Sequence, residues 1–167
     1  SDMTLTDDNF ATIVEAVKQG RGIYDNIKKA VSFLLGTNIG ELLTVFFAML
    51  IWRKSPLLSM QLLWINLVTN GIQDVGLAFE AGESGLMRLP PRPPSEKLIN
   101  RAMLEQVGLS SLVMVLVCLP AWYILLNVSG LREESARASL MTLLVIMQFY
   151  HVLNCRSEHV SAFRVPV

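Results

Sequence analysis

The 167 residues would suffice for one soluble domain, but 52% apolar residues, 17% charged residues and a mean hydropathy of +0.46 are typical of a membrane protein. The 14 Lys and Arg balance the 14 Asp and Glu, so the net charge by itself neither favours nor excludes a nucleic-acid partner, and we expect none. The charged residues gather between apolar stretches of about twenty residues, the length that crosses a bilayer as a helix. This pattern excludes a large soluble core.

Four apolar stretches predict an all-α membrane protein with four transmembrane helices. The expected spans are residues 31–52, 57–79, 106–126 and 139–154. An even number of spans places both termini on the same side. Ten of the 14 Lys and Arg lie in the N-terminal segment, the 80–105 loop and the tail, and four lie in the other loops. The positive-inside rule therefore predicts cytoplasmic termini.

Residues 1–30 are expected to form a cytoplasmic stalk that continues the first transmembrane helix. The apolar positions keep a helical period from Phe10 into the membrane. A helix unbroken to Trp52 would contain 43 residues and measure about 65 Å, roughly twice the hydrocarbon thickness. Gly20 and Gly22 favour the alternative, a separate amphipathic helix on the membrane surface.

The remaining segments are expected to connect or to anchor the helices. The loop at 87–95 holds four of the seven prolines and is expected to be extended. We expect the chain to be a fragment, because it begins without an initiator methionine. Residues 155–167 would then be a cytoplasmic tail or a linker to further helices. In span three, Pro120 predicts a kink, and Trp122 and Tyr123 predict an aromatic anchor at the membrane interface.

Polar side chains stand near the middle of the first two spans. A carboxylate at this depth costs about 2.5–3.5 kcal/mol on insertion scales. No Lys or Arg lies at a matching depth, so Glu41 and Asp74 need a proton, water or an external cation as partner. The polar residues near the middle of these two spans are Asn38 and Glu41, flanked by threonines at 37 and 44, and Asn66, Thr69, Asn70, Gln73 and Asp74.

The spacing of these residues predicts that they converge. Asn38 and Glu41 are three residues apart, and Asn66, Asn70 and Asp74 follow one another at steps of four, so each set forms one stripe on its helix. Two facing stripes would make an oxygen-rich cage suited to calcium, sodium, potassium or magnesium rather than to copper or zinc. The dipeptide Asn70-Gly71 also favours local unwinding of the second helix.

Some of the neighbouring residues have a simpler interpretation as packing residues. We expect Gly36 and Gly40, a GxxxG pattern, and the threonines at 37 and 44 to pack against another helix. In span four, Gln148 is a further candidate ligand, whereas His151 is expected to make an interfacial hydrogen bond. The cysteines at 118 and 155 have no metal-ligand spacing.

Several segments resemble, in the same order, the C-terminal membrane region of type II P-type cation-transporting ATPases, calcium pumps in particular. The resemblance runs over nearly the whole chain. Its segments are Asp7–Phe10, Gly20–Asn26, Asn38–Glu41, Leu63–Gly71 and Met87–Arg92.

The resemblance implies that the four spans are helices five to eight of a ten-helix transport domain, with a stalk leading from the phosphorylation domain. The transported cation would be calcium or, as alternatives, sodium or potassium. The plasma membrane of a bacterium is the expected location. The implied ligands, together with Asp74 from the spacing above, are Asn38, Glu41, Asn66, Thr69, Asn70, Asp74 and Gln148.

Two of these positions depart from the calcium-pump pattern. Asn70 stands where those pumps carry an Asp, and Gln148 stands where they carry a Glu, so two carboxylates are missing. Asp74 restores one charge. Because divalent selectivity depends on the number of charged ligands, the sequence leaves calcium and monovalent ions open.

The chain contains no Asp-Lys-Thr-Gly phosphorylation motif. ATP and magnesium would therefore act only through domains absent from this chain, and we expect the fragment alone to be inactive. Its partners would be the bilayer and the rest of the same pump. Two alternatives are a free-standing four-helix channel or pump regulator, and a purely structural role for the polar residues.

Overall fold

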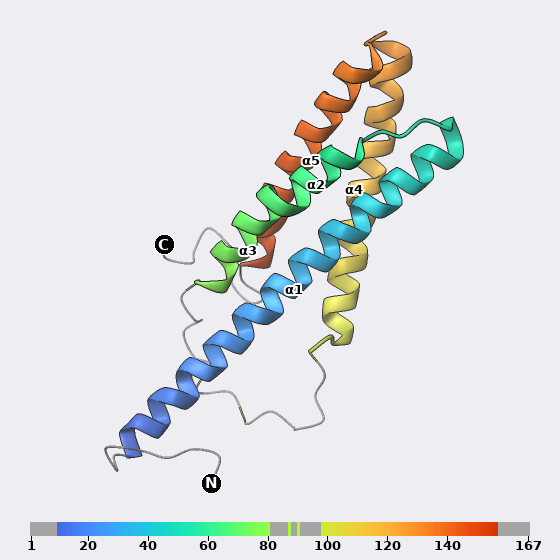
Figure 1. The fold of residues 1–167 in the computed structure, drawn as a ribbon. Coiled ribbons are helices and arrows are strands. Elements are labelled where there is room, and N and C mark those ends of the chain that lie inside the picture. Colours follow the sequence, from blue (N-terminus) through green and yellow to red (C-terminus); the bar gives the residue numbers. More distant parts are fainter. Residues whose placement is uncertain (1–9, 81–86, 88–89, 91–97, 157–167) are drawn as a thin grey trace.

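The computed structural model describes residues 10–80, 87, 90 and 98–156, and these residues form helices joined by short turns. Within them there is no β-strand, and the expected all-α fold of four helices is confirmed (Figure 1). The segments Ser59–Trp64 (α2), Ile65–Asn70 (η1) and Gly71–Ala78 (α3) follow one another without a break, as do Arg101–Tyr123 (α4) and Ile124–Val128 (η3). The elements are α1 (Phe10–Trp52), α2 (Ser59–Trp64), η1 (Ile65–Asn70), α3 (Gly71–Ala78), α4 (Arg101–Tyr123), η3 (Ile124–Val128) and α5 (Glu133–Cys155).

Three helical runs in the described residues are long and apolar enough to cross a membrane: Phe10–Trp52, Arg101–Val128 and Glu133–Cys155. The second predicted span is also helical, from Ser59 to Ala78, but in three pieces. The chain reverses direction after each helix, so that α1 and α4 run one way and α2–α3 and α5 the other (Figure 1). The predicted tail beyond residue 156 and most of the proline-rich loop lie outside the described residues.

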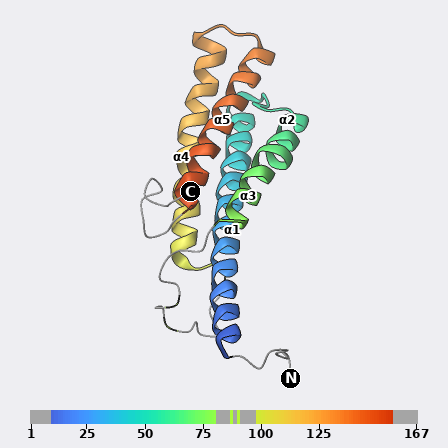
Figure 2. The same ribbon diagram turned by 90° about the vertical axis from the view of Figure 1, so that its left-hand side faces the viewer.

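Helix α1 is a single helix of 43 residues and therefore about 65 Å long. Its first part projects beyond the other helices, which confirms the predicted extension of the first span (Figure 2). Gly20 does not interrupt it, and a Cβ built there would meet nothing within 4 Å. The alternative of a separate surface helix is wrong, because the helix continues unbroken into the apolar segment.

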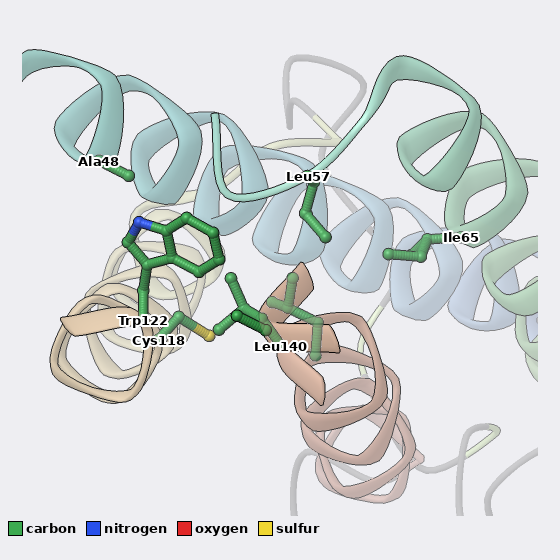
Figure 3. Close-up of a cluster of buried hydrophobic side chains, with 8 residues drawn as sticks. Ala48, Leu57, Ile65, Cys118, Trp122 and Leu140 are labelled. Carbon is green, nitrogen blue, oxygen red and sulfur yellow. The ribbon is translucent and has the colours of Figure 1, made fainter. Parts of the chain in front are cut away.

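Two groups of buried apolar residues hold the helices together at different levels. We call the larger one the Trp122 cluster; it joins all four helices near the α1–α2 turn (Figure 3). The smaller one, the Phe33 cluster, joins α1, α3 and α5 at the opposite level. The Trp122 cluster contains Ala48, Leu57, Ile65, Cys118, Trp122, Ala136, Leu140 and Leu144, and the Phe33 cluster contains Phe33, Leu77 and Cys155.

The predicted interfacial role of Trp122 is wrong. Its side chain is fully buried in the cluster that bears its name, between residues of α1 and α5 (Figure 3). Tyr123, by contrast, is 48% exposed, and its ring lies 6.2 Å from the ring of Trp52. Successive residues of a helix point about 100° apart, and here Trp122 faces the bundle while Tyr123 faces outward.

Small residues of α1 allow a close approach to α4, as the sequence predicts. The hydroxyl of Ser111 donates to the carbonyl of Gly36 at 3.0 Å. A Cβ added at Gly40 would lie 2.5 Å from Sδ and 3.1 Å from Cβ of Met114. Thr44 donates to the carbonyl of Gly40 at 2.7 Å within its own helix. These residues therefore serve packing.

The irregular part of the second span differs from the prediction. The backbone is not unwound at Asn70; instead, the helix widens into the π-helical segment η1, from Ile65 to Asn70. Gly71 has ordinary helical angles, φ −58° and ψ −41°. A π-helical turn keeps its hydrogen bonds while changing the register of the side chains, and such turns are frequent at functional sites.

Polar contacts fasten the bundle at the α1–α2 turn. Arg53 adopts a left-handed conformation with φ 53°, which ends α1 and reverses the chain. Lys54 forms an ion pair with Glu133, and Arg137 donates to the carbonyl of Ser55 at 3.1 Å. The turn is thereby tied to the beginning of α5.

Asn26 and Arg156 fasten the opposite end of the bundle. The amide of Asn26 on α1 donates to the carbonyls of Ala78, at 3.2 Å, and Glu80, at 2.7 Å. The guanidinium of Arg156, directly after α5, donates to the carboxylate of Glu80 at 2.5 Å. The base of the projecting part of α1 is thereby connected to the ends of α3 and α5.

We predict that Gly40→Val destabilises the full-length protein by about 1–3 kcal/mol, because the added side chain overpacks against Met114. The control is Gly108→Val on α4, where a Cβ would meet nothing within 4 Å. The unfolding temperature in detergent should fall for the first variant and change little for the second. Equal unfolding temperatures would contradict the packing account.

Candidate functional site

A polar layer lies between the two apolar clusters. On α1, Glu41 lies between Phe33 and Ala48; on α5, Gln148 lies between Leu144 and Cys155. The η1 segment contributes its asparagines at the same level, after Ile65 of the Trp122 cluster. Three helices thus place polar side chains in one layer, with apolar packing on either side.

Glu41 is at the centre of this layer. Its side chain is 3% exposed. One carboxylate oxygen, Oε2, accepts from the amide of Asn66 at 3.0 Å, and the other, Oε1, accepts from the amide of Gln148 at 2.5 Å. The carboxylate thus joins α1 to η1 and to α5.

The two asparagines of η1 extend this network. Asn70 donates to Oδ1 of Asn66 at 3.1 Å, and Asn66 also donates to the carbonyl of Leu62 at 3.0 Å. Asn70 is fully buried and has no direct bond to Glu41. We call Glu41, Asn66, Asn70 and Gln148 the Glu41 cluster.

The cluster combines one negative charge with amide groups. Within the described residues, no Lys or Arg donates to Glu41, and its partners are the two amide N–H groups. Two amide oxygens in the cluster, Oδ1 of Asn70 and Oε1 of Gln148, are buried without a hydrogen-bond partner there. Free oxygen atoms in an apolar region attract a cation or a water molecule.

The other three predicted ligands do not join the cluster. Asn38 is exposed on α1, and Thr69 and Asp74 are half-buried. In the part of the chain that the structure describes, no hydrogen bond connects any of them to Glu41 or its partners. The predicted stripe of Asn66, Asn70 and Asp74 is therefore correct only for its first two residues.

Gln73 occupies the buried position that the spacing of the polar residues predicts for Asp74. Its side chain is 6% exposed, and both polar atoms of its amide lack a partner among the described residues. Residues seven apart lie on the same face of a helix, so the step from Asn66 to Gln73 was a signal for this position in the sequence. Gln73 is among the polar residues of the second span but not among the predicted ligands.

His151 packs against α1 and is buried in the bundle. It is 8% exposed, its ring lies 5.7 Å from that of Phe33, and a Cβ at Gly36 would lie 2.7 Å from its Nε2. Within the described residues, no three His, Cys, Asp or Glu side chains form a group that could hold a metal ion. A cation in the polar layer would therefore depend on Glu41 together with amide oxygens.

The chain is similar in sequence to cation pumps. Residues 54–167 match the family described as "Cation transporting ATPase, C-terminus". The chain is 38% identical, over 99% of its length, to the probable cation-transporting ATPase F of Mycobacterium tuberculosis. It is 37% identical, over 95%, to a calcium-transporting ATPase of Bacillus subtilis, and 34% identical, over 100%, to calcium-transporting ATPase 1 of Schizosaccharomyces pombe.

The matched region is one part of these relatives. The chain spans 18% of the length of each of the three proteins. Membrane-spanning relatives and three apolar helices of sufficient length identify it as an integral membrane protein. The chain belongs to the P-type cation-transporting ATPases, as part of their C-terminal region.

Proposed function

We propose that the Glu41 cluster binds the cation that the complete pump transports. The observation that carries this proposal is a buried carboxylate whose described partners are neutral amides, in a layer that contains free amide oxygens. Carboxylates within membrane helices are costly, and they commonly mark ion pathways. The similarity to cation-transporting ATPases along almost the whole chain supports the same interpretation.

Rotation of the amide groups would let the cluster alternate between an empty and a loaded form. In the arrangement described above, Asn66 and Gln148 direct N–H groups toward Glu41 and thereby stabilise its charge. A cation beside Glu41 removes the need for these donors. Rotating either amide exchanges its nitrogen for its oxygen, which then becomes a ligand. The same side chains thus serve both forms.

Calcium is our first candidate for the transported ion. Carboxylate and amide oxygens are ligands that calcium prefers, and the relatives from Bacillus subtilis and Schizosaccharomyces pombe are calcium-transporting ATPases. One observation favours sodium or potassium as the second candidate: Glu41 is the single carboxylate of the cluster. A monovalent ion would be neutralised there, whereas a divalent ion would keep one uncompensated positive charge.

The projecting part of α1 would connect the site to ATP hydrolysis elsewhere in the pump. We place it in the cytoplasm of a bacterial cell, with both termini on that side. Movement of this stalk would reach α3 and α5 through Asn26, Glu80 and Arg156, as well as Glu41 on the same helix. Asn38, exposed on α1, would face a helix from the rest of the pump.

Glu41→Gln should abolish cation-dependent phosphorylation of the full-length pump, because the Glu41 cluster loses its single carboxylate. Phosphorylation by labelled ATP is measured against calcium, sodium and potassium concentrations. The matched control is Glu105→Gln, which removes an exposed carboxylate paired with Arg101 at the start of α4. Ordinary cation dependence in the Glu41 variant would refute the proposed function.

Gln148→Glu should favour divalent over monovalent cations, because it places a second carboxylate beside Glu41. We expect the apparent calcium affinity to rise about tenfold, equivalent to about 1.4 kcal/mol, and the sodium or potassium affinity to change less. Cation-stimulated ATP hydrolysis gives these affinities, with Gln106→Glu on α4 as control. A larger gain in apparent affinity for a monovalent ion would contradict the proposal that the number of carboxylates at this site determines the ion preference.

Gly20→Pro should uncouple ATP hydrolysis from transport, because proline breaks the hydrogen bonding of the stalk helix at a cost of about 3 kcal/mol. Gly20→Ala is the matched control, since a Cβ there meets nothing within 4 Å. Cation uptake into vesicles and ATP hydrolysis are measured on the same preparation. Equal uptake per ATP in both variants would show that the stalk need not be a continuous helix.

A further inference from the structure

Gln73 lies between the Glu41 cluster and the Phe33 cluster. One stripe of the second span runs from the half-buried Asn66 through the buried residues Asn70, Gln73 and Leu77, at steps of four, three and four residues. Asn70 belongs to the Glu41 cluster, whereas Leu77 packs with Phe33 and Cys155. The side chain between them therefore stands on the face of α3 that packs inside the bundle.

Among the described residues, the amide of Gln73 lacks the hydrogen-bond partners that a buried amide needs. Both Nε2 and Oε1 are buried, and neither has a hydrogen-bond partner in the described residues. Exchanging the nitrogen and oxygen of the amide leaves this conclusion unchanged, because both atoms lack a partner. Buried polar groups are nearly always hydrogen-bonded, and lipid supplies no water in their place. An amide that served only to join helices would have a partner on another helix.

The unpartnered atoms near this level are mainly oxygens. Oδ1 of Asn70, Oδ1 of Asp74 and Oε1 of Gln148 also lack partners in the described part of the chain. On α1, the hydroxyl of Thr37 donates to the carbonyl of Phe33 at 3.0 Å. Lys29, the buried basic residue of α1, pairs with Asp25 at 2.9 Å. These free oxygens suit a positively charged partner, and the described residues do not provide one.

We infer that Gln73 is a further oxygen ligand for the transported cation, on the side of the Glu41 cluster that faces the Phe33 cluster. The inference rests on the proposed function and adds a ligand to its site. Gln73 contributes no formal charge, so it strengthens binding and adjusts ion preference without altering the charge balance at Glu41. The Phe33 cluster closes this side of the polar layer with apolar side chains.

The test measures the cation concentration that half-saturates ATP hydrolysis by the full-length pump. Gln73→Leu removes both polar atoms and keeps a similar volume. It should raise the half-saturating concentration about 10–100-fold, the usual effect of removing a residue that supports a metal site. Gln73→Glu keeps an oxygen ligand and should remain close to the parent for a monovalent ion and bind calcium more tightly. Gln106→Leu on α4 is the control.

The outcomes separate this inference from the proposed function. If Glu41→Gln abolishes cation dependence while Gln73→Leu leaves the half-saturating concentration unchanged, the role of Gln73 is refuted and the proposed function stands. If Glu41→Gln keeps normal cation dependence, the proposed function itself is refuted. Should Gln73→Leu fail to fold, Gln73→Met, which also lacks an oxygen, replaces it, and an unchanged half-saturating concentration in that variant likewise refutes the inference.

Discussion

The structure depends on one constraint: a carboxylate is buried in the middle of apolar helices. Glu41 is 3% exposed and is stabilised by N–H groups from two other helices, at 3.0 Å and 2.5 Å. An unpaired charge at this depth would be strongly unfavourable, so the helices that supply the amides must stay in contact with α1. The two apolar clusters above and below the polar layer maintain that contact.

Close packing on the other face of α1 complements this arrangement. Gly36 and Gly40 bring α4 against α1, with Ser111 and Met114 in direct contact. Among membrane helices, where lipid is as apolar as the side chains, small residues and interhelical hydrogen bonds provide much of the specificity. Helix α1 therefore has two functions in the bundle, since one side packs on α4 and the other carries Glu41 toward η1 and α5. The continuity of α1 makes both compatible.

The sequence was sufficient to predict the helices, and the physical reason is simple. Apolar stretches bounded by charge determine the spans, and Gly36 and Gly40 indicate the packing face of α1. The exact side-chain directions were harder to predict. The sequence pattern predicts Trp122 at the membrane interface, but neighbouring helices bury it. No pattern in one segment reveals which neighbour covers a given side chain.

The candidate site shows the same limit. Glu41, Asn66, Asn70 and Gln148 do come together, whereas Asp74 is half-buried and Gln73 takes the buried position. A strict step of four residues led to Asp74. A helix has 3.6 residues per turn, so over two turns the position seven residues on keeps the same face better than the position eight residues on. The π-helical segment η1 changes the register further, and nothing in the sequence indicated a π-helix there.

The most direct test of the account is the position of the cation in the full-length pump. An electron cryomicroscopy structure in the presence of the stimulating ion would show it at high resolution. We predict density beside the carboxylate of Glu41, with the amides of Asn66 and Gln148 rotated so that their oxygens face the ion. A bound ion elsewhere in the membrane domain, with both amides still donating to Glu41, would contradict it.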